Sequence, residues 1–343
     1  MSGRLPSALV DVRLFSTADV GPLQIGQREN SLAGPVRYVS LVVSIFSQDI
    51  LPIFVVAGVG FLLARRFGAN VKTLSTVAFN ALSPCLVFDQ LVTAKVSVAQ
   101  SWRVALFCVL LTVALGVTAR LAALPLRLDR ATLSSFLLVV MFSNSGNYAL
   151  PVVLFAFGRE SLAFASVYFV TSAILVYTVG VFVAASGRGS IRSAVLGLAR
   201  VPTIYAVVAA VIVLAAGATV PLAVMRPVGL LNDAALPVMV LALGMQLERA
   251  TPSAHPAAVT AAVIVSLVVA PILAFALTAT LGLAGAARQA SIIQASMPAA
   301  VITTVLALEF DLDAGFSTNV VMFSTLLSPF TLVFLIAYLQ RGY

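Results

Sequence analysis

The sequence predicts an all-α protein that crosses a membrane many times, and three observations carry this prediction. Of the 343 residues, 61% are hydrophobic and only 9% are charged, whereas a soluble domain has about 25% charged residues. Apolar segments of about 20 residues, long enough to cross the hydrocarbon core, recur from Leu51 to the C-terminus. The connections between them are short, and at about 30 residues per segment and connection the chain allows about ten helices. No room remains for a separate soluble domain.

The expected helices alternate with connections that contain basic residues. Before the first of them, charged residues such as Asp11, Arg13 and Asp19 interrupt every apolar stretch. Residues 1–46 are therefore expected to be a poorly ordered N-terminal extension without the apolar core of a signal peptide. The expected helices are, in order, residues 47–66, 73–94, 102–124, 132–157, 161–185, 202–220, 228–248, 257–283, 288–309 and 315–338.

The two halves of this membrane region repeat short motifs in the same order, at an offset of 150 to 153 residues. We therefore expect a duplication, with a first five-helix repeat at residues 47–190 and a second at residues 191–343. Because five is an odd number, the second repeat enters the membrane from the opposite side and is inverted. The matching motifs are Leu51-Pro52-Ile53 with Val201-Pro202-Thr203, Asn80-Ala81-Leu82-Ser83-Pro84 with Asn232-Asp233-Ala234-Ala235-Leu236-Pro237, and Phe157-Gly158-Arg159-Glu160-Ser161 with Phe310-Asp311-Leu312-Asp313-Ala314.

A polar motif interrupts the fourth expected helix. It runs from Phe142 to Pro151 and contains two asparagines, two serines, a glycine and a proline, which compete with helical hydrogen bonds or remove an amide donor. The helix is therefore expected to break near Asn144 to Pro151. The corresponding ninth helix contains a similar interruption between Gln294 and Ala300. Backbone groups freed in hydrocarbon survive only where protein or a watery cavity satisfies them. Inverted repeats with broken helices in matching positions are typical of secondary transporters, whose substrate site lies where the repeats meet.

The residues of these two interruptions form the expected substrate site. A carboxylate needs hydrogen-bond donors, and no lysine or arginine falls near the middle of any expected helix. Side-chain amides, hydroxyls and the positive N-terminal ends of two half-helices are the available donors. The candidate substrate-binding residues are Ser143, Asn144, Ser145, Gly146, Asn147 and Pro151 in the first interruption, and Ser296, Met297, Pro298, Thr303 and Thr304 in the second.

Three further polar residues have two interpretations each. Asp89, inside the second helix, either carries a proton during transport or is an interfacial residue paired with Lys95. Asn80 and Asn232 either contact substrate from the scaffold or pack between helices. No metal site and no cofactor are expected, because Cys85 and Cys108 lie in apolar segments and the single histidine, His255, lies in a polar connection.

The net charge of +8 is not expected to bind nucleic acid, because the basic residues are scattered singly between apolar segments. They indicate orientation instead, since cytoplasmic loops are enriched in lysine and arginine. The connections after the first, third and fifth helices carry the most basic residues, which places both termini outside the cytoplasm in a multi-pass protein of the cell membrane. The expected partners are membrane lipid and a small organic anion, and a homodimer is left open. The basic residues concerned are Arg65, Arg66, Lys72, Arg120, Arg127, Arg130, Arg188, Arg192 and Arg200.

Several short motifs occur along the predicted membrane region: Asp49-Ile50-Leu51-Pro52, Leu82-Ser83-Pro84, Phe142-Ser143-Asn144-Ser145-Gly146, Ala149-Leu150-Pro151, Phe157-Gly158, Ala235-Leu236-Pro237, Leu243-Gly244, Ser296-Met297-Pro298-Ala299-Ala300 and Leu306-Ala307. With these motifs, the sequence from about Ser47 to the C-terminus resembles the auxin efflux carrier family of membrane transporters. This resemblance implies a ten-helix fold similar to that of bile-acid sodium symporters, with a scaffold of helices one, two, six and seven and a transport domain that contains crossed, broken helices four and nine. It also implies organic-anion substrates, such as auxin or the dicarboxylates malonate and malate. Tyr148 and Ala149 depart from the family pattern, which affects the shape of the pocket.

The leading hypothesis is a secondary transporter that moves small organic anions by elevator-type alternating access. The alternative within this class is a sodium-coupled organic-anion symporter of the bile-acid carrier type. A membrane-embedded enzyme is not expected, because the sequence contains no His-Glu-x-x-His motif, no Gly-x-Ser-x-Gly motif and no pair of intramembrane aspartates. A sensor that binds the ligand without moving it is the remaining alternative.

Overall fold

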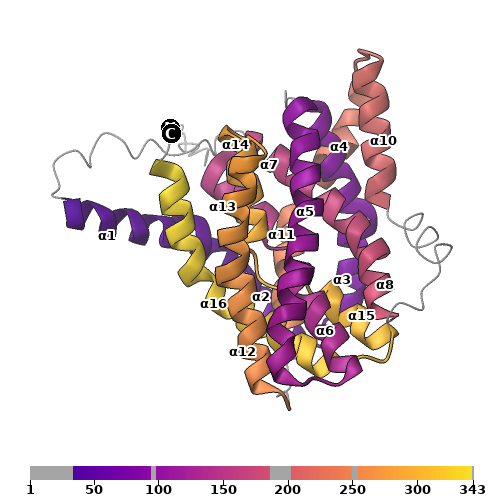
Figure 1. Cartoon of the computed structure of the whole chain (residues 1–343). Coiled ribbons are helices and arrows are strands. Elements are labelled where there is room, and N and C mark those ends of the chain that lie inside the picture. The colour runs from indigo at the N-terminus through magenta and orange to yellow at the C-terminus, as the bar shows by residue number, and fades with distance from the viewer. Residues whose placement is uncertain (1–33, 94–97, 186–201, 249–253, 342–343) are drawn as a thin grey trace, which may run out of the picture.

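The computed structural model describes residues 34–93, 98–185, 202–248 and 254–341, and these residues are almost entirely helical (Figure 1). Seven of the described helices are long and apolar enough to cross a membrane. The ten-helix count and the inverted repeat stay predictions. The seven candidate spans are Ser40–Phe67, Val71–Thr93, Ala99–Leu126, Ala149–Ala184, Leu222–Leu247, Pro256–Thr280 and Ala314–Arg341, and two shorter apolar helices are Arg130–Met141 and Pro202–Ala215.

The first helices begin earlier than the sequence predicts. Helix α1 starts at Gly34 and runs through a π-helical turn into α2, so part of the predicted extension is helical. Residues 1–33 of that extension lie outside the described residues. The elements of this region are α1 (Gly34–Ile45), η3 (Phe46–Ile50), α2 (Leu51–Phe67), α3 (Val71–Val77), η4 (Ala78–Leu82), α4 (Ser83–Thr93) and α5 (Val98–Ala123).

The next helices contain a sharp turn at Gly158. Its φ of 80° and ψ of −169° lie in a region that residues with a Cβ rarely adopt. The turn divides α7 into a part that follows the first interruption and a part that leads into α8. It lies where the sequence predicts one helix to end at residue 157 and the next to begin at residue 161. These elements are η5 (Leu124–Leu126), α6 (Arg130–Met141), α7 (Ala149–Leu175), η6 (Val176–Gly180) and α8 (Val181–Ala184).

The C-terminal region also contains long helices and one interruption, between α14 and α15. In Figure 1, α12, α6 and α15 lie at the lower end of the bundle, whereas α14 lies at the upper end and α16 crosses the bundle obliquely. The elements are α10 (Pro202–Ala215), α11 (Leu222–Leu247), α12 (Pro256–Ile264), η7 (Val265–Val269), α13 (Ala270–Thr280), α14 (Gly285–Ala295), α15 (Ile302–Glu309) and α16 (Ala314–Arg341).

Helices α2 and α11 touch backbone to backbone through two glycines. A Cβ added to Gly244 would lie 1.7 Å from the carbonyl oxygen of Ala57, and one added to Gly60 would lie 2.1 Å from that of Leu241. Small residues allow such close approach between membrane helices, where van der Waals packing drives association. This contact joins two helices of the predicted scaffold.

Candidate functional site

The first predicted interruption is present, and it is shifted slightly along the chain. Helix α6 ends at Met141 and α7 begins at Ala149, with no helical conformation in residues 142–148. The sequence placed the break between Asn144 and Pro151. Pro151 instead lies in the first turn of α7, where an amide donor would have no helical partner in any case.

The second predicted interruption is also present. Helix α14 ends at Ala295 and α15 begins at Ile302, which leaves residues 296–301 outside both helices. Ser296, Met297 and Pro298 are buried in this segment, whereas Thr303 and Thr304 belong to the first turn of α15.

The two interruptions pair with each other through their backbones. Ser143 and Ala299 form an isolated antiparallel bridge. On one side of it the Asn144 amide donates to the Pro298 carbonyl at 2.7 Å, and on the other the Ala300 amide donates to the Phe142 carbonyl at 2.9 Å. Each break thus satisfies groups that the other break has freed, as a non-helical segment at membrane depth requires. We call residues 142–148 and 296–301 together the paired break.

The side chain of Gln294, the residue at which the second predicted interruption begins, links the paired break to α7. Its fully buried side chain donates from Nε2 to the carbonyl oxygens of Ser145 and Ala165, both at 3.1 Å. In return, the Ser143 hydroxyl donates to the Gln294 backbone carbonyl at 2.9 Å. One glutamine therefore connects α14, the first interruption and α7.

Helix α16 forms hydrogen bonds with the paired break from another side, and the sequence analysis missed this role. The hydroxyl oxygen of Ser324 accepts a hydrogen bond from the Ala299 amide at 3.1 Å, and the Ser328 hydroxyl donates to the Tyr148 phenol oxygen at 3.1 Å. The signal was visible in the sequence, because Ser317, Ser324 and Ser328 have the spacing of one helical face. All three are fully buried.

Three side-chain amide atoms at the paired break have no hydrogen-bond partner. They are Nδ2 of Asn144, Oδ1 of Asn147 and Oε1 of Gln294, on side chains that are only 5%, 4% and 0% exposed. A buried donor or acceptor left unsatisfied costs about 1–3 kcal/mol. These three atoms are therefore buried polar groups at the paired break that a bound ligand can satisfy.

Several of the predicted donors are engaged within the protein instead. Ser296 donates to the Ile292 carbonyl and Thr303 to the Ala300 carbonyl, both at 2.6 Å. Gly146 fits its position because an added Cβ would lie 2.8 Å from the Phe169 ring. Of the remaining candidates, Ser145 and Met297 are buried within the paired break and Thr304 is half-buried beside it.

The structure brings together two candidates that lie outside the paired break. The Asn232 side chain of α11 donates to Oδ2 of Asp89 in α4 at 3.3 Å, and both residues are 9% exposed. Lys95, the other partner considered for Asp89, lies outside the described residues. Asn80 is exposed and donates to the Thr76 carbonyl of its own helix at 2.9 Å, an intrahelical contact rather than a contact with another helix.

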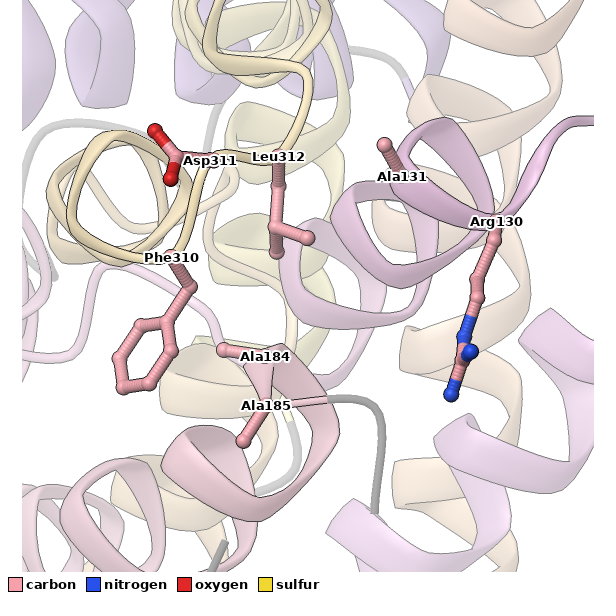
Figure 2. Close-up of a pocket in the computed structure, with 7 residues that line it drawn as sticks. All are labelled: Arg130, Ala131, Ala184, Ala185, Phe310, Asp311 and Leu312. Atoms are coloured by element: carbon pink, nitrogen blue, oxygen red, sulfur yellow. The ribbon is translucent and has the colours of Figure 1, made fainter. Parts of the chain in front are cut away.

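A pocket of about 450 Å³ lies at the end of the bundle where α6 begins and α8 ends. In Figure 2, Arg130 and Asp311 stand on opposite sides of this pocket, with Phe310, Leu312 and the two alanines of the α8 end between them. It contains no predicted site residue. One small apolar cluster contains Phe142 and Ala300 of the paired break together with Ala184 of the pocket lining.

Two aspartate side chains accept hydrogen bonds from backbone amides at the starts of the helices near this pocket. Asp129 caps α6 by accepting from the amides of Ala131 and Thr132, at 2.8 and 3.1 Å, and from the Thr132 hydroxyl at 2.7 Å. These hydrogen bonds, the one from the Thr132 hydroxyl first, lower the pKa of Asp129. Asp313 likewise accepts from the Phe316 amide at 2.8 Å in the first turn of α16.

Comparison with known proteins agrees with this architecture. The family model described as membrane transport protein matches residues 45–336. An uncharacterized transporter of Methanothermobacter thermautotrophicus is 26% identical over 292 residues, which cover 82% of this chain and 94% of the relative. An uncharacterized transporter of Methanocaldococcus jannaschii is 24% identical over 206 residues, which cover 59% of this chain and 67% of the relative. With a family match over most of its length and an interrupted helical bundle, this chain belongs to the membrane transport protein family, the family of the auxin efflux carriers.

Proposed function

We propose that this transporter moves small organic anions across the cell membrane and that the paired break holds the substrate. The observation that supports this most strongly is the set of buried amide atoms without partners, in a break that lies between membrane helices. Such groups are expensive in a membrane interior and are typically functional there. Membrane transport itself is given by the family; the substrate class and the position of its site are the proposal.

The chemistry of the paired break suits a carboxylate. Asn144 offers a side-chain N–H, and both α7 and α15 begin at the paired break. A helix N-terminus carries about half a positive charge, so two of them can stabilise an anion without a lysine or arginine. Binding by dipoles and amides is weaker than binding by a buried cation, which favours the release that a transporter needs.

We further propose that α5–α8 and α12–α16 move as a unit against α2–α4, α10 and α11, in an elevator-type cycle. The backbone contact between α2 and α11 supports an immobile scaffold, and the hydrogen bonds from Gln294 and Ser324 support a transport unit that moves with the paired break intact. We also propose, from the basic residues in the connections after the first, third and fifth predicted helices, that both termini lie outside the cytoplasm.

An interior-negative membrane potential drives anions outward by about 2.3 kcal/mol per charge per 100 mV. Efflux therefore needs no coupling ion, whereas uptake of a dicarboxylate does. The sodium-coupled symporter is the alternative function, because unpartnered amide oxygens, together with backbone carbonyls, are ligands that a cation accepts. Flux measured with and without a sodium gradient separates the two functions.

Substitution of Asn144 tests the proposed site. In proteoliposomes loaded with malate, Asn144→Ala should reduce exchange of radiolabelled malate by at least about tenfold, which corresponds to the loss of one hydrogen bond of about 1.4 kcal/mol to a charged group. Asn70→Ala is the matched control, because Asn70 is exposed at the start of α3, where its side chain accepts a hydrogen bond from the Thr73 amide of the same helix. Equal exchange by the wild type and Asn144→Ala would place the substrate elsewhere.

Asp89 is the proposed proton carrier, because it is a carboxylate held within a candidate membrane span by a neutral partner, Asn232. If it carries a proton, Asp89→Asn should retain exchange at zero proton gradient but lose the stimulation that a pH gradient gives the wild type. A variant that responds to the gradient as the wild type does would assign Asp89 to structure alone.

A further inference from the structure

We infer that the side chain of Tyr148 limits the size of the substrate, so that this transporter accepts small aliphatic acids and rejects acids that carry an aromatic ring. This inference rests on the proposed function and extends it to substrate selection. Of the substrates considered above, it selects the dicarboxylates over the aromatic acid auxin. It follows from the position of the Tyr148 ring, between the paired break and a helix of the proposed scaffold.

Tyr148 is the last residue of the first interruption and directly precedes α7. Its exposed fraction is 0%, and it is the largest fully buried side chain among the described residues. Its ring contacts the half-buried ring of Phe54 in α2, with the ring centroids 6.0 Å apart and an angle of 86° between the ring planes. Its phenol oxygen accepts the hydrogen bond from Ser328 of α16. The side chain is therefore held between the proposed scaffold and the proposed transport unit.

The Tyr148 ring lies on the side of the paired break that faces the proposed scaffold. Besides the contact with Phe54 of α2, helix α7, which begins directly after Tyr148, packs against α4 and α11 of that scaffold. When one helix bundle moves against another around a substrate site, the substrate lies where the two bundles meet. The ring therefore occupies space beside the proposed position of the substrate.

A ring held in this way leaves little room for a second one. Protein interiors are packed as densely as organic crystals, and extra atoms inserted into a packed site displace side chains and backbone at a cost in free energy. Removing a large buried side chain has the opposite effect, because it leaves a cavity. An apolar cavity of about 150 Å³ is large enough to bind benzene. A ring on the substrate can therefore take the place of the ring that Tyr148 loses on truncation.

Two dicarboxylates that differ by one ring test the inference. Malate and 2-benzylmalate share the same four-carbon chain, carboxylates and hydroxyl, and the second acid carries an added benzyl group. The assay is uptake of each radiolabelled acid by proteoliposomes that contain the full chain, scored as kcat/KM. The wild type should prefer malate by about tenfold or more, because the added ring overpacks the site.

Tyr148→Ala should bring this preference close to one by raising transport of 2-benzylmalate, because the substrate ring fills the space that the variant opens. Tyr148→Phe should keep the wild-type preference, because it retains the ring and loses only the hydrogen bond to Ser328. Phe54→Ala opens the same space from the scaffold and should shift the preference in the same direction, which provides a second test if Tyr148→Ala does not fold.

Phe136→Ala is the matched control for a general loosening of the protein. Phe136 is also fully buried, but its ring stacks on Phe316 of α16, with the ring centroids 6.1 Å apart. Any effect of its truncation on transport should therefore be the same for the two acids, and the wild-type preference should remain.

Equal transport of the two acids by the wild type would overturn the inference and leave the proposed function in place. The inference would also fail if Tyr148→Ala and Phe54→Ala both transported malate with the wild-type preference, or if both reduced transport of the two acids alike. Tyr148 would then have a structural role alone. If the wild type transports neither acid, the proposed function falls, and this inference falls with it.

Discussion

Replacing Gln294 with methionine should destabilise the paired break more than any other single change of similar size. Methionine has nearly the same length but no N–H group, so the carbonyl oxygens of Ser145 and Ala165 lose their donor. At about 1–3 kcal/mol for each buried group left unsatisfied, two new unpaired carbonyls cost about 2–6 kcal/mol, and removal of the unpaired Oε1 of Gln294 offsets about 1–3 kcal/mol, so the net loss is about 1–3 kcal/mol. The average of about 0.6 kcal/mol per hydrogen bond between membrane helices sets a lower bound near 1 kcal/mol.

The assay is reversible unfolding of the purified protein in detergent micelles, with Gln246→Met as the matched control. Gln246 makes a single hydrogen bond of 3.4 Å to the Ser75 hydroxyl at a half-buried site, so its replacement should lower the free energy of unfolding by less than about 0.6 kcal/mol. The reasoning would be refuted if Gln294→Met were as stable as the wild type or no less stable than Gln246→Met. Gln294 would then not hold the paired break in place.

Three further predictions concern the scaffold, a helix cap and the α16 contact. Gly244→Ala should destabilise the protein by about 1–3 kcal/mol or more in the same unfolding assay, whereas Gly229→Ala, with open space around it, should have little effect. Asp129→Ala should lower the free energy of unfolding by about 1 kcal/mol at neutral pH. Because the pKa of Asp129 is lowered in the folded state, this stabilisation is fully present above the pKa of the unfolded state and is lost as the pH falls through the pKa of the folded state. The melting temperatures of wild type and variant should therefore converge in acid. Ser324→Ala should slow anion exchange several-fold by freeing a backbone amide of the paired break, and Ser317→Ala, which removes a hydroxyl without a partner, should not. Equal effects of the two members of any pair, or melting curves that stay parallel down to pH 3, would contradict the corresponding prediction.

The sequence predicts the interruptions well because their causes are local. Asparagine, serine, glycine and proline disfavour a helix wherever they cluster, so the motif around Asn144 and the one around Pro298 identify both breaks. The exact limits differ by a few residues, since Pro151 is tolerated in the first turn of a helix. Most helix boundaries follow from the same local signals.

Contacts between distant parts of the chain could not be predicted in the same way. That Gln294 reaches Ala165, or that Ser324 reaches Ala299, depends on how helices pack in three dimensions. The hydroxyl of Ser296 counted as a free donor in the sequence, but it bonds to the carbonyl four residues earlier, an option open to any serine in a helix. Sequence spacing alone does not decide whether a serine hydroxyl donates to a ligand or to a backbone carbonyl of its own helix.

Protection of a single cysteine at the paired break tests most directly whether this region holds the substrate. Ser145→Cys, in a chain whose Cys85 and Cys108 are replaced by alanine, would be labelled with a membrane-permeant maleimide while the anion concentration is raised. We predict that malate slows the labelling saturably, half-maximally near its KM for transport. A labelling rate that stays constant at saturating concentrations of a transported anion would contradict the placement of the substrate at the paired break.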